Sequence, residues 1–91
     1  MRIQWTELAR SDVNGIWDHI QRDNPMAAEL VESRILASIR TLQQFPLRGR
    51  PGRVSGTREL VVPASPYVVV YAVDDLRIEI LRVLHGAMDW P

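Results

Sequence analysis

"PYVVVYAVDDLRIEILRVLH", residues 66–85, is the stretch of this chain that decides the fold. Residues 67–73 are β-branched or aromatic almost without interruption, which favours a central strand covered on both faces, at least in part. Asp74 and Asp75 form a turn of hairpin length, and residues 77–85 return as a second strand. The stretch therefore predicts an antiparallel hairpin at the centre of a sheet.

The returning strand, residues 77–85, does not alternate cleanly between apolar and polar side chains. Ile78 and Ile80 share one face, but strict alternation then places Leu81 and Val83 on the other. One interpretation is a bulge near Leu81 that changes the phase of the strand. The other is a sheet that is apolar on both faces, with Leu81 and Val83 on an uncovered face suited to a partner.

Two amphipathic helices are expected upstream of this hairpin. Thr6 suits the N-cap of a helix that ends near Asp23, and Asn24-Pro25 is a start signal for a second helix that Pro46 stops. Because almost no residues separate the helices, they should form an antiparallel pair. Their expected core-facing residues are Leu8, Ala9, Val13, Ile16, Trp17 and Ile20, then Ala27, Leu30, Val31, Ile35, Ile39, Leu42 and Phe45.

The remaining segments complete the order strand, helix, helix, strand, strand, strand. Residues 2–5 and 57–62 read as strands, and residues 46–56, with two Pro and three Gly, read as a loop. This order predicts an α+β fold, in which a helical hairpin packs on a small, mainly antiparallel sheet. The length of 91 residues predicts a single domain over residues 1–91.

Composition removes several classes of site. The chain has no cysteine, so it has no disulfide and no thiolate metal site, and its histidines, His19 and His85, have no second ligand at useful spacing. We expect no metal and no cofactor. No segment reads as a signal peptide or a membrane span, so we expect a cytoplasmic protein without membrane contact.

The net charge is zero, but the charge is unevenly distributed. Every basic residue is arginine, and the segment 48–58 holds four of them and no acid. A basic loop on a neutral protein suggests a contact for an anionic partner, although a solvated loop is the simpler explanation. The four residues are Arg48, Arg50, Arg53 and Arg58.

Acid–base cleavage of RNA is the enzymatic alternative. It needs an acid, a base and cations that stabilise charge on the phosphorane. His85 and Glu59 are the candidate titrating groups, with Arg53, Arg58 or Arg82 as the cations. Against this alternative, a histidine at a strand end before a glycine is more often an ordinary turn residue.

Four strings in order carry a resemblance to a known family: "FPLRGRPGR", "TRELVV", "PYVVVYAV" and "IEILRVLHGAMDWP". The chain resembles the RelE/ParE superfamily of bacterial type II toxins, and specifically the ParE-like, or plasmid stabilisation, toxins. The resemblance covers essentially the whole chain. It implies either a poison of DNA gyrase, as in ParE-like members, or a ribosome-dependent mRNA endoribonuclease, as in RelE-like members.

The resemblance favours the gyrase-binding activity. Where RelE-like nucleases carry arginines, this chain has Val68 and Ala87-Met88, and where they often end on tyrosine it has Trp90-Pro91. We therefore predict a toxin that binds gyrase and is not an enzyme. The predicted target contacts are Arg48, Arg50, Arg53, Arg58, Arg82 and His85. A RelE-like nuclease using Arg58, Glu59, Arg82 and His85, or an inactive antitoxin-binding homologue, are the alternatives.

The resemblance also implies a cognate antitoxin that is ParD-, RelB- or Phd-like. It would bind the uncovered sheet face and the helical hairpin, and operator DNA would be contacted only through it. Much of its affinity should come from apolar anchors in a segment that folds on binding. The predicted antitoxin contacts are Tyr67, Tyr71, Leu81, Val83 and Trp90.

Overall fold

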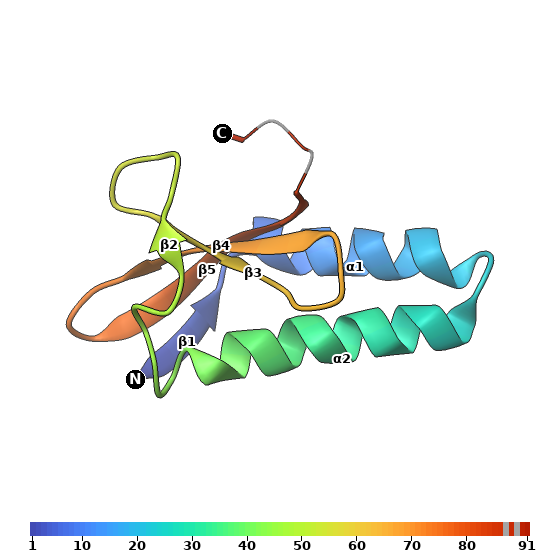
Figure 1. The fold of residues 1–91 in the computed structure, drawn as a ribbon, viewed down its shortest axis with the longest axis horizontal. Coiled ribbons are helices and arrows are strands. Elements are labelled where there is room, and N and C mark those ends of the chain that lie inside the picture. Colours follow the sequence, from blue (N-terminus) through green and yellow to red (C-terminus); the bar gives the residue numbers. More distant parts are fainter. Residues whose placement is uncertain (87, 89) are drawn as a thin grey trace.

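The structure, a computed structural model, describes residues 1–86, 88, 90 and 91 (Figure 1). Its elements are β1 (Arg2–Trp5), α1 (Glu7–Gln21), α2 (Pro25–Thr41), β2 (Arg50–Pro51), β3 (Arg58–Val61), β4 (Tyr67–Val73) and β5 (Arg77–His85). They form the expected α+β fold. The short strand β2 is an addition, since it lies inside the segment predicted as loop and pairs with β3.

The strands form one five-stranded sheet in the order β1-β5-β4-β3-β2. β1 runs parallel to β5, and the other pairs are antiparallel. The hairpin of β4 and β5 is thus central, as the apolar stretch 66–85 predicted. β1 and β2 lie at opposite edges of the sheet.

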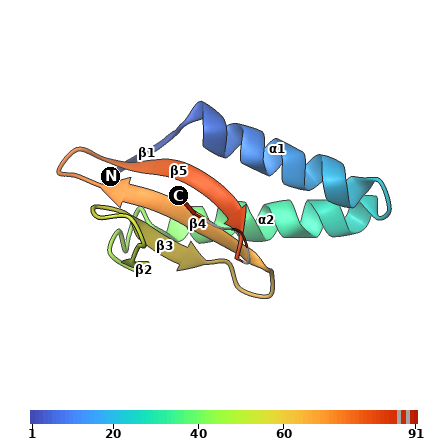
Figure 2. The same ribbon diagram turned by 90° about the horizontal axis from the view of Figure 1, so that it is seen from above.

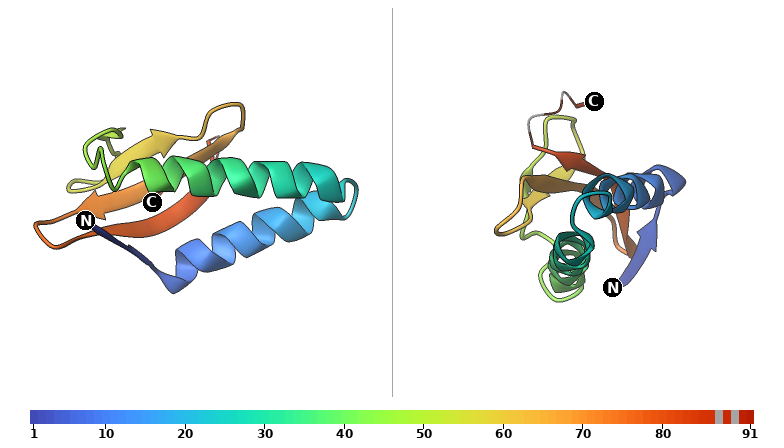
Figure 3. Two further views of the ribbon diagram at one scale, coloured as in Figure 1. Left: turned by 90° about the horizontal axis from the view of Figure 1, so that it is seen from below. Right: turned by 90° about the vertical axis from the view of Figure 1, so that its right-hand side faces the viewer.

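The helices form the predicted antiparallel hairpin, with α1 beside β5 and α2 across the face of β4 (Figures 2 and 3). Both predicted caps are present. The Thr6 hydroxyl and the Asn24 side-chain oxygen each accept a hydrogen bond, at 3.1 Å, from the backbone N–H three residues on. These bonds satisfy donors that a helix start otherwise leaves unpaired.

Four expectations about the helices were wrong: the end of α2 and the core positions of Phe45, Leu8 and Leu30. α2 ends at Thr41 and not at Pro46, because Leu42 N–H already bonds the carbonyl of Ile39 in a tight final turn. Phe45 therefore lies outside the helix and is 55% exposed. Leu8 and Leu30 are also exposed, since each lies about 100° around its helix from the adjacent inward-facing residue.

β4 is buried on both faces. Val69 and Tyr71 belong to the core under the helices, and Val68 and Val70 on the other face are also buried. The fully buried residues Tyr71, Ile35, Leu42, Ile78 and Ile80 form the centre of the core.

Among the described residues, no helix is long and apolar enough to cross a bilayer.

β5 contains the bulge that the sequence left open as one of two interpretations. Val70 pairs with Arg82 and Tyr71 pairs with Ile80, so Leu81 is an extra residue on β5. The bulge returns Val83 to the helix-facing core, where it is 2% exposed. The expectation that Val83 lies on an uncovered sheet face was therefore wrong, and Leu81 is half-buried.

Candidate functional site

Glu59 holds the basic segment together. Its carboxylate, on β3, is almost fully buried and accepts a hydrogen bond from the backbone N–H of Arg53 at 2.9 Å. The guanidinium groups of Arg50 and Arg53 lie 3.3 and 3.6 Å from the other carboxylate oxygen, Oε1. The Arg53 N–H, and then the two guanidiniums, hold the pKa of Glu59 below its ordinary value despite burial. A carboxylate whose pKa is lowered and whose oxygens are occupied by N–H groups is a weak base, so it is poorly suited to accept a proton.

Arg58 and Tyr71 hold the chain that follows α2. Arg58 Nη1 donates to the carbonyl of Gly49 at 2.7 Å and of Leu47 at 3.3 Å. The Tyr71 hydroxyl accepts from Gly49 N–H at 2.8 Å and donates to the Pro46 carbonyl at 2.9 Å. Burial raises the pKa of Tyr71. Arg58 is therefore engaged by carbonyls, on the face opposite to Glu59.

Arg82 forms a two-pronged ion pair with Asp12 of α1. Its Nε and Nη2 donate to the two carboxylate oxygens at 2.8 and 2.9 Å, which raises the pKa of Arg82. The guanidinium carbon lies 5.9 Å from the centroid of the Trp90 ring, within the range of a cation–π contact. Sequence reasoning missed Asp12, because it lies 70 residues from Arg82 and reads as an ordinary outward-facing helix residue.

His85 lies apart from the other nuclease candidates. Its exposed ring packs edge-on against Tyr67, with ring centroids 5.9 Å apart. His85 pairs with Tyr67 and Arg58 pairs with Tyr71, so about 13 Å of strand separates the two positions. Glu59 and Arg82 both pair with Val70, so these two residues do lie in one row across the three strands. The four candidates for acid–base chemistry therefore do not meet at one point.

The predicted target contacts divide between two faces of the sheet. Arg50, Arg53 and Arg82 gather on the face away from α2, where the C-terminal residues and the β2–β3 loop lie (Figure 1). Arg53 Nη1 donates to the Met88 carbonyl at 3.3 Å, which ties these two segments together. Arg48 is exposed, and within residues 1–86, 88, 90 and 91 it has no carboxylate partner. Ala87 lies outside the described residues.

The predicted antitoxin contacts are mostly inaccessible. Tyr71 is fully buried, Tyr67 is 8% exposed, and the bulge buries Val83. The helices cover these side chains, so they do not offer the apolar anchor points that the sequence suggested. Leu81 and Trp90 are partly accessible.

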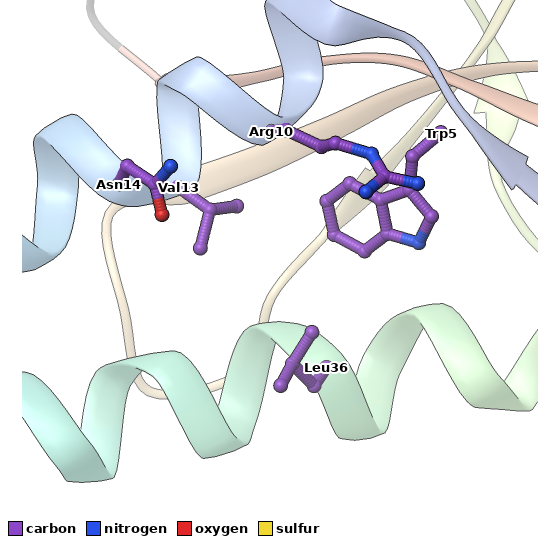
Figure 4. Close-up of a pocket in the computed structure, with 5 residues that line it drawn as sticks. All are labelled: Trp5, Arg10, Val13, Asn14 and Leu36. Atoms are coloured by element: carbon purple, nitrogen blue, oxygen red, sulfur yellow. The ribbon is translucent and has the colours of Figure 1, made fainter.

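A groove between the helices and β1 was not predicted. Trp5 of β1, Arg10, Val13 and Asn14 of α1 and Leu36 of α2 line it (Figure 4). An adjoining hollow shares Trp5 and Leu36 and extends along β1 to Ile3, Ile39, Arg40 and Gln43. The groove thus has an apolar floor, arginines on both helices and an edge strand beside it. The sequence did not predict this groove from Trp5 and Leu36, because an apolar residue at either position is equally compatible with the core.

The fold places this chain among proteins of the RelE/ParE type. A family model described as ParE toxin of type II toxin-antitoxin system, parDE, matches residues 3–90. The Y4kP protein of Sinorhizobium fredii is 40% identical over 90 residues, which cover 99% of this chain and 93% of that protein. Toxin RelE2 of Caulobacter vibrioides is 36% identical over 86 residues, which cover 94% and 96% of the two chains.

A solved structure supports the same assignment. A chain in the chromosomal ParDE TA system from P. aeruginosa superposes with a TM-score of 0.85 at 31% identity, covering 93% of this chain and 95% of that one. The chain described here belongs to the ParE toxin family of type II toxin–antitoxin systems. The resemblance inferred from the sequence is therefore confirmed.

Proposed function

We propose that this ParE-family toxin inhibits DNA gyrase by binding it, and that a cognate antitoxin neutralises it. One observation carries the choice of binding over catalysis: the groups that could perform acid–base chemistry are engaged or dispersed. Glu59 is ionised between two guanidiniums, and His85 lies about 10 Å along the strands from the row that holds Glu59 and Arg82. RNA cleavage needs an acid, a base and cations around one phosphate.

The proposed gyrase-binding surface is the face that carries Arg50, Arg53 and Arg82, extended by Arg48. The side chains of Arg50 and Arg53 are 59% and 44% exposed, although both are held by Glu59. Exposed guanidiniums that a neighbouring carboxylate holds in place are suited to recognise carboxylates or phosphates on a partner. Arg58 and His85 are weaker candidates, because neither lies beside this group.

The antitoxin is proposed to occupy the groove along β1. The P. aeruginosa structure is of a ParDE toxin–antitoxin system, and this supports an antitoxin partner here. Arg10 and Arg40 beside an apolar floor favour a segment with leucine-like anchors and acidic neighbours. Leu81 and Trp90 remain proposed contacts, and operator DNA would be bound through a ParD-, RelB- or Phd-like antitoxin.

The decisive experiment measures two activities of one preparation. Purified toxin is added to gyrase with relaxed plasmid, and supercoiling and trapped DNA cleavage are scored. The same toxin is added to a translation reaction, and mRNA cuts are mapped by primer extension. We expect loss of supercoiling with uncut mRNA. Codon-positioned mRNA cuts with unchanged supercoiling would replace the proposal with the nuclease alternative.

A matched pair of variants tests the proposed surface. Arg48→Ala should raise the toxin concentration needed for half-inhibition of gyrase several-fold. Arg22→Ala, which removes an arginine at the far end of α1, should leave this concentration unchanged.

Normal growth of cells expressing wild-type toxin without antitoxin would instead support an inactive homologue.

A further inference from the structure

The guanidinium group of Arg82 is fixed in orientation and still has unused hydrogen-bond donors. A guanidinium has five N–H groups, and Asp12 takes one from Nε and one from Nη2. Among the described residues, Nη1 donates no hydrogen bond, and the side chain is 26% exposed. The guanidinium is therefore fixed in orientation by Asp12 and partly exposed, and it has N–H groups left to bind a ligand.

Asp12 does more than neutralise this charge. β1 ends at Trp5, so the edge of β5 beyond Ile80 has no strand beside it within the described part of the chain. The start of α1 satisfies the backbone groups of this edge instead. Thr6 donates from its N–H to the Ile80 carbonyl and from its hydroxyl to the Leu81 carbonyl. Asp12 Oδ2 accepts a hydrogen bond from Val83 N–H at 2.9 Å. The Asp12 carboxylate thus satisfies a backbone N–H at the sheet edge and also aligns Arg82, which follows the bulge.

The Trp90 ring supplies the third constraint on the guanidinium. The indole lies on the side of the sheet where Arg53 binds the Met88 carbonyl. A planar cation held by a carboxylate and an aromatic ring loses little conformational entropy when it binds a ligand. Its geometry matches two oxygens of a carboxylate or a phosphate.

We propose that Asp12 is a positioning residue, which holds Arg82 so that its remaining N–H groups bind an oxyanion of the toxin's target. This inference rests on the proposed function, in that the chain acts by binding a target. Asp12 itself would not contact that target. Its effect on activity should therefore pass entirely through Arg82.

A double-mutant cycle tests this dependence. Asp12→Asn keeps an oxygen for Val83 N–H but loses the charge and the second oxygen that align Arg82. We expect Asp12→Asn to raise the toxin concentration for half-inhibition of gyrase about tenfold. Arg82→Ala should cost at least as much, and adding Asp12→Asn to it should cause no further loss. Asp18→Asn, an exposed carboxylate on the same helix, is the control.

A role in stability alone would give a different pattern. Asp12→Asn would then lower activity, antitoxin affinity and melting temperature together, and it would do so equally in the wild-type chain and in the Arg82→Ala chain. That result would overturn the inference. If wild-type toxin leaves gyrase unaffected, the proposed function fails by itself, and growth arrest on expression becomes the readout for the same four chains. Where wild-type toxin does inhibit gyrase, comparing its binding to gyrase with and without DNA distinguishes a protein carboxylate from a DNA phosphate as the bound oxyanion.

Discussion

At the scale of single residues, this small protein keeps its inward-facing charges by pairing each with a specific partner. Glu59 is buried between Arg50 and Arg53, and Asp12 and Arg82 form a partly buried pair. An unpaired charge in either place would cost several kcal/mol. The arginines that the sequence marks as a basic patch are thus partly structural.

The pairing of Glu59 predicts a specific acid sensitivity. Its pKa lies below the ordinary value of 4.5, so it adds stability above about pH 4.5 that is lost as the pH falls through the folded-state pKa. Glu59→Gln should lower the free energy of unfolding by about 1–3 kcal/mol at pH 7 and flatten its decline as the pH falls below about 4.5. Urea unfolding at several pH values measures both effects.

Glu29→Gln, on the exposed surface of α2, is the control for a simple change of net charge. It should leave the free energy of unfolding within about 0.5 kcal/mol of wild type. Equal pH profiles for wild type and Glu59→Gln would show that Glu59 does not carry this acid sensitivity.

At the scale of elements, local signals were sufficient for the helices' starts and insufficient for their ends and faces. Thr6 and Asn24-Pro25 predicted both starts, because capping depends on residues within one turn. The end of α2 is instead a tight turn in which Leu42 N–H bonds the Ile39 carbonyl, and the exposure of Leu30 depends on which side of the helix faces the sheet. In the same way, only pairing with β4 decides between the two phases of β5.

The cap of α2 gives a prediction at this scale. Asn24→Ala removes the acceptor of Ala27 N–H and should lower the free energy of unfolding by about 1 kcal/mol. Asn24→Asp should leave the free energy of unfolding almost unchanged, because aspartate caps equally well and its negative charge is stabilised by the positive end of the helix dipole. Thermal unfolding of the three chains checks this, and an equal loss in both variants would refute the capping role.

At the scale of the whole molecule, the groove lies far from one end of the proposed gyrase-binding surface. The groove lies along β1 and the helices, whereas β2 and the β2–β3 loop, with Arg50 and Arg53, lie at the opposite edge of the sheet. An antitoxin in the groove would therefore not cover these arginines directly.

This separation predicts that the two interactions can be weakened independently. Leu36→Arg places a charge on the floor of the groove and should weaken antitoxin binding tenfold or more, with gyrase inhibition unchanged. Leu76→Arg, in the exposed turn between β4 and β5, should change neither. Calorimetric titration with antitoxin and a supercoiling assay measure the pair. Unchanged antitoxin affinity of Leu36→Arg would remove the groove as the docking site.

The sequence by itself determined the family, the order of the elements, the caps and the central hairpin, because these follow from local spacing and from strings of adjacent residues. The tertiary structure alone decided the phase of β5, the burial of Tyr71 and Val83, the partners of Glu59, and the pair of Asp12 with Arg82. Apart from the partners of Glu59, which lie within nine residues of it, these features join residues distant in the chain, and all of their energies depend on which faces meet. The arginines could be found from the sequence, but what holds each of them could not.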